Sequence, residues 1–319
     1  MTMLATAIVT LSAIIALEVF VRARGFQPSV KDDNYLWATE RARASDRSPT
    51  TMAILGSSRI LLAFSPPAFR EELPSWKYVQ LAVQGSRPLG GLIDLAMDPD
   101  FRGVALVDIV ELNFKRSGYD AMDRELAAYH RGWRAIGERA ERWLSTEVQE
   151  HLALLAAGGL RTLSALSLKG TWPTPPYTTT AADRTRFADY SLADARARRK
   201  HQLARIESWD DVQYLDGWLA EPLALEVFVA MIRSRGGNVV FVRMPTCDER
   251  WAYDESVAPK AQYWDRFAAT TRAQTIHFAD YPQLSSFECP DTSHIDSKDG
   301  PRFTRALLEI LVERGVLRR

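Results

Sequence analysis

Five short, almost wholly apolar runs rich in Val, Ile and Leu constrain the fold of this chain more than any other feature. They cover residues 52–55, 78–83, 104–110, 238–243 and 275–278. Each run has the length of a strand and lacks the polar alternation of a strand with one solvated face, so we expect burial on both faces. Stretches of helical pattern separate the runs. This arrangement predicts an α/β fold with a doubly wound, mostly parallel sheet.

The interval between the third and fourth runs is too long for an ordinary crossover connection. Residues 115–235 are mostly charged and helical in pattern. Residues 172–180 are rich in Pro and Thr and are expected to form neither a helix nor a central strand. Near the end of the interval, Pro222 is expected to open a helix over residues 223–235. We therefore predict a helical insertion at 115–235 that contains one long surface loop.

The beginning of the chain is one long apolar run, unlike the short runs expected to form strands. Residues 1–17 carry no charge, and the apolar run continues past Glu18 to Val21. About 20 such residues in a helix cross a hydrocarbon core of roughly 30 Å. This predicts a transmembrane anchor over 1–24, then a polar juxtamembrane neck over 25–49 and the α/β domain over 50–319. The alternative is a cleaved signal peptide, but Met1-Thr2-Met3 supplies no basic leader.

Charge and cysteine content exclude several classes of function. The chain has 319 residues with 40 Lys+Arg and 40 Asp+Glu, so a net charge of zero gives no signature of nucleic-acid binding. Two cysteines, far apart, are too few for a cysteine-based zinc module. No glycine loop has the spacing that cradles phosphate. The sequence therefore implies no cofactor and no metal.

A possible nucleophile follows the first apolar run directly, in Gly56-Ser57-Ser58-Arg59. Ligands of doubly wound sheets bind at the carboxyl ends of the strands, so a hydroxyl at this point faces the binding crevice. Glycine permits the sharp turn, and the next helix N-terminus stabilises negative charge beside Ser58. Taken alone, the motif is equally typical of a strand-to-helix turn with a serine cap.

A matching base and its carboxylate occur near the other end, in Asp291-Thr292-Ser293-His294. This polar segment lies between the last strand and the final helix, again at the carboxyl edge of the sheet. A serine hydroxyl needs an adjacent base, and histidine suits that task because its pKa lies near neutrality. A carboxylate three residues earlier can hold the second ring nitrogen. Joint placement of the two motifs predicts a Ser58-His294-Asp291 triad.

These motifs, in this order, resemble the SGNH (GDSL-type) hydrolase superfamily. Within it the chain is most similar to membrane-anchored members that act on cell-envelope polymers: alginate O-acetylation proteins and the D-alanyl transfer protein of teichoic acids. The resemblance runs from the N-terminal anchor through Gly56-Ser57-Ser58, Gly85, Asn113 and Met244-Pro245 to Asp291 and His294. It implies an SGNH-like domain in which Ser58 is the nucleophile, His294 the base and Asp291 its orienting partner.

The resemblance also implies three donors to an oxyanion: the backbone amide of Ser58, Gly85 and Asn113. Two departures from the family pattern bear on this assignment. Ser57 stands where the family usually has Asp, as it does in the teichoic-acid branch. Leu112 stands where a glycine normally precedes the asparagine, and Glu111 is a rival to Asn113 on the same strand end. Gly85 and Asn113 have simple alternatives as turn residues.

Four further residues are candidates for substrate binding. Arg59 and Arg87 flank the expected site and suit an anionic substrate. Trp172 and Tyr177 offer flat apolar faces for a sugar ring, although packing of their loop onto the domain is the simpler alternative. His130, His151 and His201 lack metal-ligand spacing and are expected at the surface or in helix packing. His277 is expected to be a satisfied core histidine.

Position alone suggests a disulfide between Cys247 and Cys289. Cys247 follows Met244-Pro245 at the end of the fourth strand, and Cys289 lies two residues before Asp291. Both loops leave neighbouring parallel strands at the same edge, where a Cα separation of roughly 5–6 Å is feasible. The alternative is two unrelated buried thiols.

The sequence therefore predicts a membrane-anchored enzyme that performs serine-based acyl transfer on a cell-envelope or exported polysaccharide, as an O-acetylesterase or an O-acyltransferase. We expect its domain on the extracytoplasmic, periplasmic side, although Arg22 and Arg24 would be cytoplasmic on a strict positive-inside count. Two rivals remain open. One is a non-catalytic accessory subunit that partners a multi-pass membrane O-acyltransferase, and the other is a lipid or thioester hydrolase.

Overall fold

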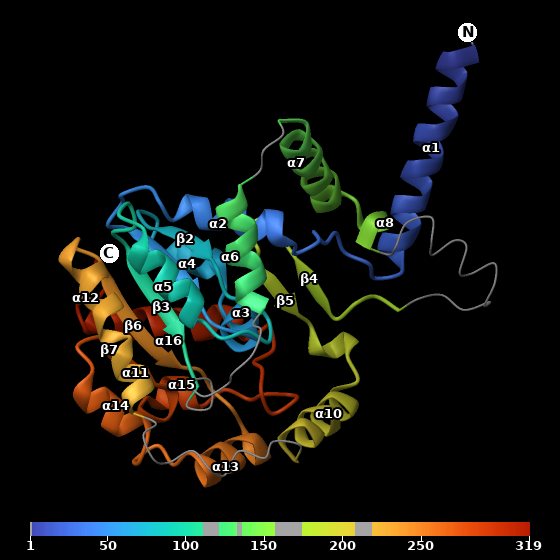
Figure 1. Cartoon of the computed structure of the whole chain (residues 1–319). Coiled ribbons are helices and arrows are strands. Elements are labelled where there is room, and N and C mark those ends of the chain that lie inside the picture. Colours follow the sequence, from blue (N-terminus) through green and yellow to red (C-terminus); the bar gives the residue numbers. More distant parts are fainter. Residues whose placement is uncertain (1, 111–120, 133–135, 157–173, 208–218) are drawn as a thin grey trace.

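A five-stranded parallel sheet forms the centre of the computed structural model, which describes residues 2–110, 121–132, 136–156, 174–207 and 219–319 (Figure 1). All neighbouring strands pair in parallel register. The strand order is β2-β1-β3-β6-β7, the order typical of one kind of doubly wound sheet. The α/β prediction is confirmed. The strands are β1 (Thr51–Leu55), β2 (Lys77–Gln80), β3 (Val104–Asp108), β6 (Asn238–Arg243) and β7 (Gln274–His277).

The five strands fall within one to three residues of the five apolar runs. The largest difference is at β2, which ends at Gln80 although the apolar run continues to Val83. The amides of Leu81 and Val83 still donate to the carbonyls of Ile54 and Gly56, at 2.8 and 3.0 Å. The apolar run therefore marks the full length over which this segment lies beside β1.

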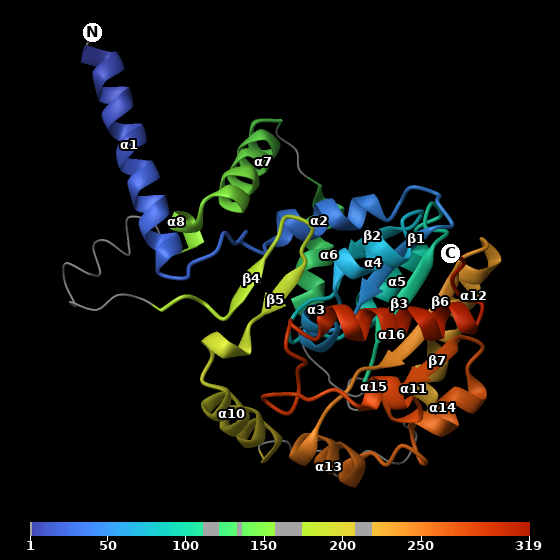
Figure 2. The same cartoon turned by 180° about the vertical axis from the view of Figure 1, so that it is seen from behind.

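Helices cover both faces of the sheet, as burial of both strand faces requires. On one face a single core joins the sheet to α2 (Asn34–Arg43), α5 (Leu89–Met97), α6 (Ala121–Arg131), α12 (Glu226–Ser234) and α14 (Trp264–Thr270). The other face carries α3 (Ser58–Ala63), α4 (Pro66–Glu72), α15 (Pro282–Ser285) and α16 (Gly300–Glu313), and Figure 2 shows the molecule from the opposite side to Figure 1. In α16, Phe303, Leu307 and Leu311 form one stripe that is buried against the sheet.

Helix α2 lies in the range expected to be a polar neck, and it packs on the domain instead. Trp37 is fully buried in the first core, and its indole N–H donates to the carbonyl of Leu81 at 3.1 Å. Arg41 forms buried ion pairs with Asp94 and Asp98 at 2.5 and 3.0 Å. Part of the range predicted as a neck therefore packs on the core, with the few apolar side chains of α2 on its inner face.

The interval between β3 and β6 holds more than the expected helices. Besides α6 and α12 its described part contains a two-stranded antiparallel hairpin that the sequence did not suggest. Its other elements are α7 (Ile136–His151), α8 (Ala153–Ala156), β4 (Thr178–Thr180), β5 (Arg186–Ala188), the 3₁₀ turn η2 (Tyr190–Leu192), α10 (Ala195–Glu207) and α11 (Ala220–Ala224). Buried Arg184 ties the hairpin to the sheet by donating to the carbonyls of Gln80 and Ala82, at 2.8 and 3.1 Å. The hairpin therefore lies beside the carboxyl end of β2.

The helix expected over 223–235 is divided into α11 and α12 at Leu225. Pro222 lies inside α11 rather than before it, at the third helical position. Proline is tolerated there because the first amides of a helix have no intrahelical acceptor.

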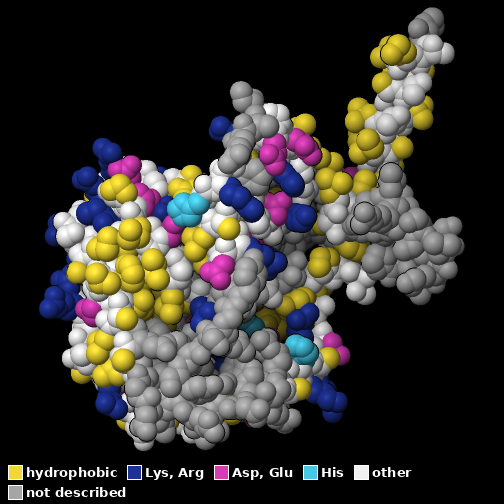
Figure 3. Space-filling model, in the orientation of Figure 1, with side chains coloured by type: hydrophobic (Ala, Val, Ile, Leu, Met, Phe, Trp, Pro, Cys, Tyr) yellow, Lys and Arg dark blue, Asp and Glu magenta, His cyan; other side chains and the backbone are white. Residues whose placement is uncertain are grey.

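Helix α1 (Thr2–Ala23) extends away from the domain, and its apolar side chains are exposed along most of its length (Figure 3). It is long and apolar enough to span a membrane, as a signal sequence would also be. Its lower end contacts the domain, where the carboxylate of Glu18 accepts the amides of Ala153 and Leu154 at 2.8 and 2.9 Å. These contacts fix α8 to the base of α1.

Candidate active site

Ser58 occupies the sharp turn between β1 and α3. Gly56 has a φ angle of +153°, a value that side chains rarely adopt. A Cβ at this position would lie 2.6 Å from Cγ2 of Ile60 and 2.7 Å from Cβ of Asp108. Only glycine therefore allows α3 to start directly above the strand. Ser58 is the first residue of α3, and its hydroxyl lies at the carboxyl edge of the sheet.

His294 comes from the loop between α15 and α16, 236 residues from Ser58 in sequence, and meets it in space. The Ser58 Oγ and His294 Nε2 atoms are 2.7 Å apart, and His294 Nδ1 is 2.9 Å from Asp291 Oδ2. A carboxylate only accepts hydrogen bonds, so Nδ1 carries the ring hydrogen and Nε2 accepts from the serine hydroxyl. The structure thus brings the three residues of the expected triad into one hydrogen-bonded chain.

Asp291 is held in place by four hydrogen bonds. Its Oδ1 accepts the backbone amides of Ser293 and His294, at 3.0 and 2.9 Å. Its Oδ2 accepts from His294 and from the phenol of Tyr190, at 2.9 and 2.7 Å. Burial by itself would raise the pKa of Asp291, but the bonds from His294, Tyr190 and Ser293 hold the pKa well below its usual value. The carboxylate is therefore ionised at neutral pH and faces the imidazole in a fixed direction.

Tyr190 is a site residue that the sequence analysis missed. It lies in η2, 101 residues from Asp291, and its side chain is buried. Burial and the neighbouring Asp291 carboxylate raise the pKa of its phenol, so it stays a hydrogen donor. Nothing local in the sequence marks this residue, because its role depends on how the insertion packs against the Asp291 loop.

Replacing Tyr190 by Phe should lower kcat about tenfold, because a hydrogen bond to a charged carboxylate is worth about 1.5 kcal/mol or more. The pKa of Asp291 should also rise, since the lost hydrogen bond from Tyr190 favours the ionised form in the wild-type protein. The stability that this low pKa provides is present above the pKa of the unfolded chain and is lost as the pH falls through the folded pKa. In the variant this contribution should be smaller and its loss complete at a higher pH, so acid unfolding should occur at a higher pH. Acid unfolding and the pH profile of kcat measure both effects.

Tyr281→Phe is the matched control, because Tyr281 is not among the described residues that line the cavity. If the acid side of the pH profile of kcat is unchanged in Tyr190→Phe, the role of Tyr190 in holding Asp291 is contradicted.

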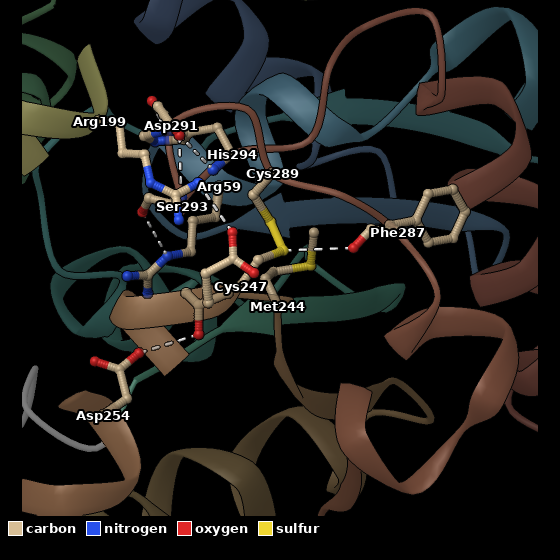
Figure 4. Close-up of a disulfide and its surroundings, with 12 residues drawn as sticks. Arg59, Arg199, Met244, Cys247, Asp254, Phe287, Cys289, Asp291, Ser293 and His294 are labelled. Carbon is tan, nitrogen blue, oxygen red and sulfur yellow. Dashed lines mark hydrogen bonds and ion pairs between the residues drawn. A yellow bond between two sulfur atoms is a disulfide. The ribbon is translucent and has the colours of Figure 1, made fainter. Parts of the chain in front are cut away.

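A disulfide joins the end of β6 to the loop that carries Asp291 and His294 (Figure 4). The Cα atoms of Cys247 and Cys289 are 5.7 Å apart. Beside the bond, the amide of Cys247 donates to the carbonyl of Thr292 at 2.9 Å, and the amide of Thr292 donates to Cys289 at 2.8 Å. Thr292 has a φ angle of +70°, which is uncommon for a side-chain residue. The Asp291 loop is thus held from several sides.

The triad opens into a cavity of about 610 Å³. Described residues that line it come from the β1–α3 turn, the segments after β2 and β3, the insertion with α10, α13 (Asp248–Val257) and the Asp291 loop. They include Ser57, Ser58, Arg59, Gln84, Gly85, Ser86, Tyr177, Arg198, His201, Gln202, Arg250 and His294. The cavity is large enough for a sugar ring with an ester substituent.

Two of the three expected oxyanion donors lie at this cavity. Ser58 is in the first turn of α3, where backbone amides lack intrahelical acceptors. Gly85 lines the cavity with a φ angle of +72° and open space where a Cβ would be. Asn113 and its rival Glu111 lie outside the described residues. The positions of Ser58 and Gly85 are compatible with two amides directed at one oxygen atom.

The four expected substrate-binding residues differ in their placement. Arg59 and Tyr177 line the cavity, whereas Arg87 is absent from its described lining and Trp172 lies outside the described residues. Tyr177 packs edge-on against Tyr190, and the Arg198 guanidinium lies 3.4 Å from the centre of its ring. Tyr177 therefore holds Arg198 at the cavity. The Tyr177 ring is itself largely covered by Arg198 and Tyr190.

Two histidines can be compared with their expected roles. His201 is exposed, as expected, and it also lines the cavity from α10. His277 is buried as expected, and its Nδ1 accepts the amide of Ala279 at 3.1 Å. Its Nε2 has no hydrogen-bond partner among the described residues, so it is only half satisfied. Burial and nearby Arg243 lower the pKa of His277 to about 2, which keeps it neutral. No group of potential metal ligands occurs within the described ranges.

Comparison with known proteins shows a weak structural likeness. No family model matches this chain, and no curated protein matches it. Among solved structures it is similar to one titled "Crystal Structure of TesA", an SGNH hydrolase, with 11% identity and a TM-score of 0.38 over 84% of this chain and 99% of that one. A likeness of this size carries no weight for activity or substrate, which must come from the site itself.

Proposed function

We propose that this protein is a serine-dependent acyl-transfer enzyme, an O-acetylesterase or O-acyltransferase. The observation that supports this most is the hydrogen-bonded chain from Ser58 through His294 to Asp291, at the mouth of a cavity. A non-catalytic accessory subunit would have no need of a nucleophile, base and carboxylate in hydrogen-bond contact. The geometry therefore favours catalysis over simple binding.

In the proposed reaction the Ser58 oxygen attacks the carbonyl carbon of an ester, and His294 Nε2 takes the hydroxyl proton. Asp291 keeps the imidazole oriented and stabilises its positive charge. The amides of Ser58 and Gly85, with Asn113 by the resemblance, bind the oxyanion; one such donor is typically worth about 3 kcal/mol. When the intermediate collapses, His294 returns the proton to the departing alcohol. The acyl group on Ser58 then passes to water or to a sugar hydroxyl, with His294 again acting as base.

The proposed substrate is an acyl ester of a cell-envelope or exported polysaccharide. Three features support it: the resemblance to membrane-anchored envelope enzymes, a helix at the N-terminus able to cross a membrane, and a cavity of about 610 Å³. A multi-pass membrane O-acyltransferase is the partner that the same resemblance suggests.

We place the domain on the extracytoplasmic side of the membrane. The Cys247–Cys289 disulfide supports this side, because such bonds persist in oxidising compartments such as the periplasm and are rare in the cytosol. The bond lies beside the triad loop, so its formation is coupled to the placement of the base.

The proposed function is tested by a serine-directed fluorophosphonate on the full chain. The probe should label Ser58 alone, because among the described residues only this serine hydroxyl contacts a histidine that can remove its proton. Peptide mass mapping identifies the labelled residue, and hydrolysis of an aryl acetate shows that the protein is active. A label on Ser57, or an active protein that takes no label, would reject the assignment.

A further inference from the structure

Arg59 is a buried cation that forms no ion pair with the residues that the structure describes. Its side chain starts from the residue after the nucleophile, and only 8% of Arg59 is exposed. Its Nε–H donates to Ser293 Oγ at 3.3 Å, and among the described residues its guanidinium makes no other hydrogen bond and no salt bridge (Figure 4). A buried charge in this state is costly, so folded proteins normally pair it.

Of the two nearby carboxylates, Asp254 is fully engaged by other groups and Asp108 partly so. Asp254 binds Arg243 and Arg250, at 2.7 and 2.8 Å. Asp108 accepts the backbone amides of Ser57 and Met244, and its Oδ1 has no hydrogen-bond partner among the described residues. Among the described residues, the guanidiniums of Arg59, Arg243 and Arg250 lie near the carboxylates of Asp254 and Asp108. Burial, together with Arg250 and Arg243, lowers the pKa of Arg59 to about 9.

The uncompensated charge faces the catalytic cavity. Arg59 and Arg250 line the same cavity as Ser58 and His294, and Arg198 lines it from α10. The only acid among the described lining residues is Asp291, which is fully engaged by its hydrogen bonds to the triad loop and to Tyr190. Among the described lining residues, an anion in this cavity would therefore meet three guanidiniums and no free carboxylate.

We propose that Arg59, with Arg250 beside it, forms an anion subsite that binds a carboxylate of the ester substrate next to Ser58. This inference rests on the proposed function and names the substrate class: esters that carry a carboxylate near the bond to be broken. The guanidinium fork matches a carboxylate in two parallel hydrogen bonds. The carboxylate comes either from the acyl chain or from the sugar, and the same subsite serves both.

Two matched substrate pairs distinguish these sources in the full-length protein. One compares 4-nitrophenyl acetate with mono-4-nitrophenyl succinate, which places a carboxylate on the acyl chain. The other compares an acetylated methyl glucoside with the corresponding glucuronoside, which places it on the sugar. We expect the wild-type protein to favour the charged member of one pair in kcat/KM. Arg59→Met should reduce that preference roughly 10- to 100-fold, and Arg59→Lys should reduce it less.

Stability supplies a second, independent readout. Methionine removes an unpaired buried charge at similar volume, so Arg59→Met should melt at or above the wild-type temperature. Free glucuronate or succinate should raise the melting temperature of the wild-type protein and leave that of Arg59→Met unchanged. Arg70→Met is the matched control, since Arg70 is exposed and pairs with Asp183 away from the cavity.

The inference is overturned if the wild-type protein favours the neutral member of both pairs, or if Arg59→Met leaves the preference unaltered. If the protein still hydrolyses the aryl acetate and is labelled at Ser58, either result rejects the anion subsite but not the proposed function. Loss of both aryl acetate hydrolysis and Ser58 labelling would instead reject the proposed function. If Arg59→Met does not fold, the inference is tested by the substrate preference of Arg59→Lys and by the ligand-induced melting shift of the wild-type protein.

Discussion

Replacing Ser58 by Ala is expected to reduce kcat for acetyl-ester hydrolysis roughly 10⁴- to 10⁶-fold, because no other group in the cavity replaces the attacking oxygen. The residual rate would come from oxyanion stabilisation and substrate binding. Release of acetate under saturating substrate measures the effect. Ser57→Ala is the neighbouring control: the Ser57 side chain makes no cap hydrogen bond, so most of the activity should remain.

His294→Ala should cost about as much as Ser58→Ala, and the double variant should be no slower than either single one. The Ser58 hydroxyl and His294 Nε2 share one hydrogen bond, so removal of either partner stops the same step. Independent, multiplicative losses would show that the two residues do not act together and would contradict the proposed mechanism.

Loss of the Cys247–Cys289 disulfide is expected to destabilise the protein by about 4 kcal/mol in the chain-entropy model, since the bond spans a sequence separation of 42 residues. For a domain of this size that corresponds to a fall in melting temperature of about 10 °C. Activity should fall as well, because the bond tethers the loop of Asp291 and His294. Thermal unfolding of the Cys247→Ser/Cys289→Ser variant, and of the wild-type protein with and without reductant, measures both.

The double-serine variant also serves as the control for reduction, since reductant should not change its melting temperature. Alkylation of unreduced protein isolated from its native compartment counts the free thiols. Two alkylatable thiols in folded, unreduced protein would contradict the disulfide and the extracytoplasmic location together.

Much of the fold is predictable from the sequence because burial imposes a composition. Strands covered on both faces must be apolar throughout, and the five apolar runs correspond to the five strands of the sheet. The same principle does not predict short, half-exposed elements, because they need no continuous apolar run. The three-residue strands β4 and β5 carry no periodic pattern, and α2 has too few apolar residues to stand out from a polar neck.

Sequence by itself determined which residues could form a triad: a serine after a glycine at the end of the first strand, and an aspartate three residues before a histidine near the last helix. Parallel topology explains why this worked, since every strand ends at the same edge and the two motifs must meet there. Only the tertiary structure decided what surrounds them. Tyr190 reaches Asp291 from the hairpin segment, and buried Arg59 bonds to Ser293 but forms no ion pair with the described residues. Both depend on packing between segments more than 100 residues apart, and local sequence patterns carry no information about such contacts.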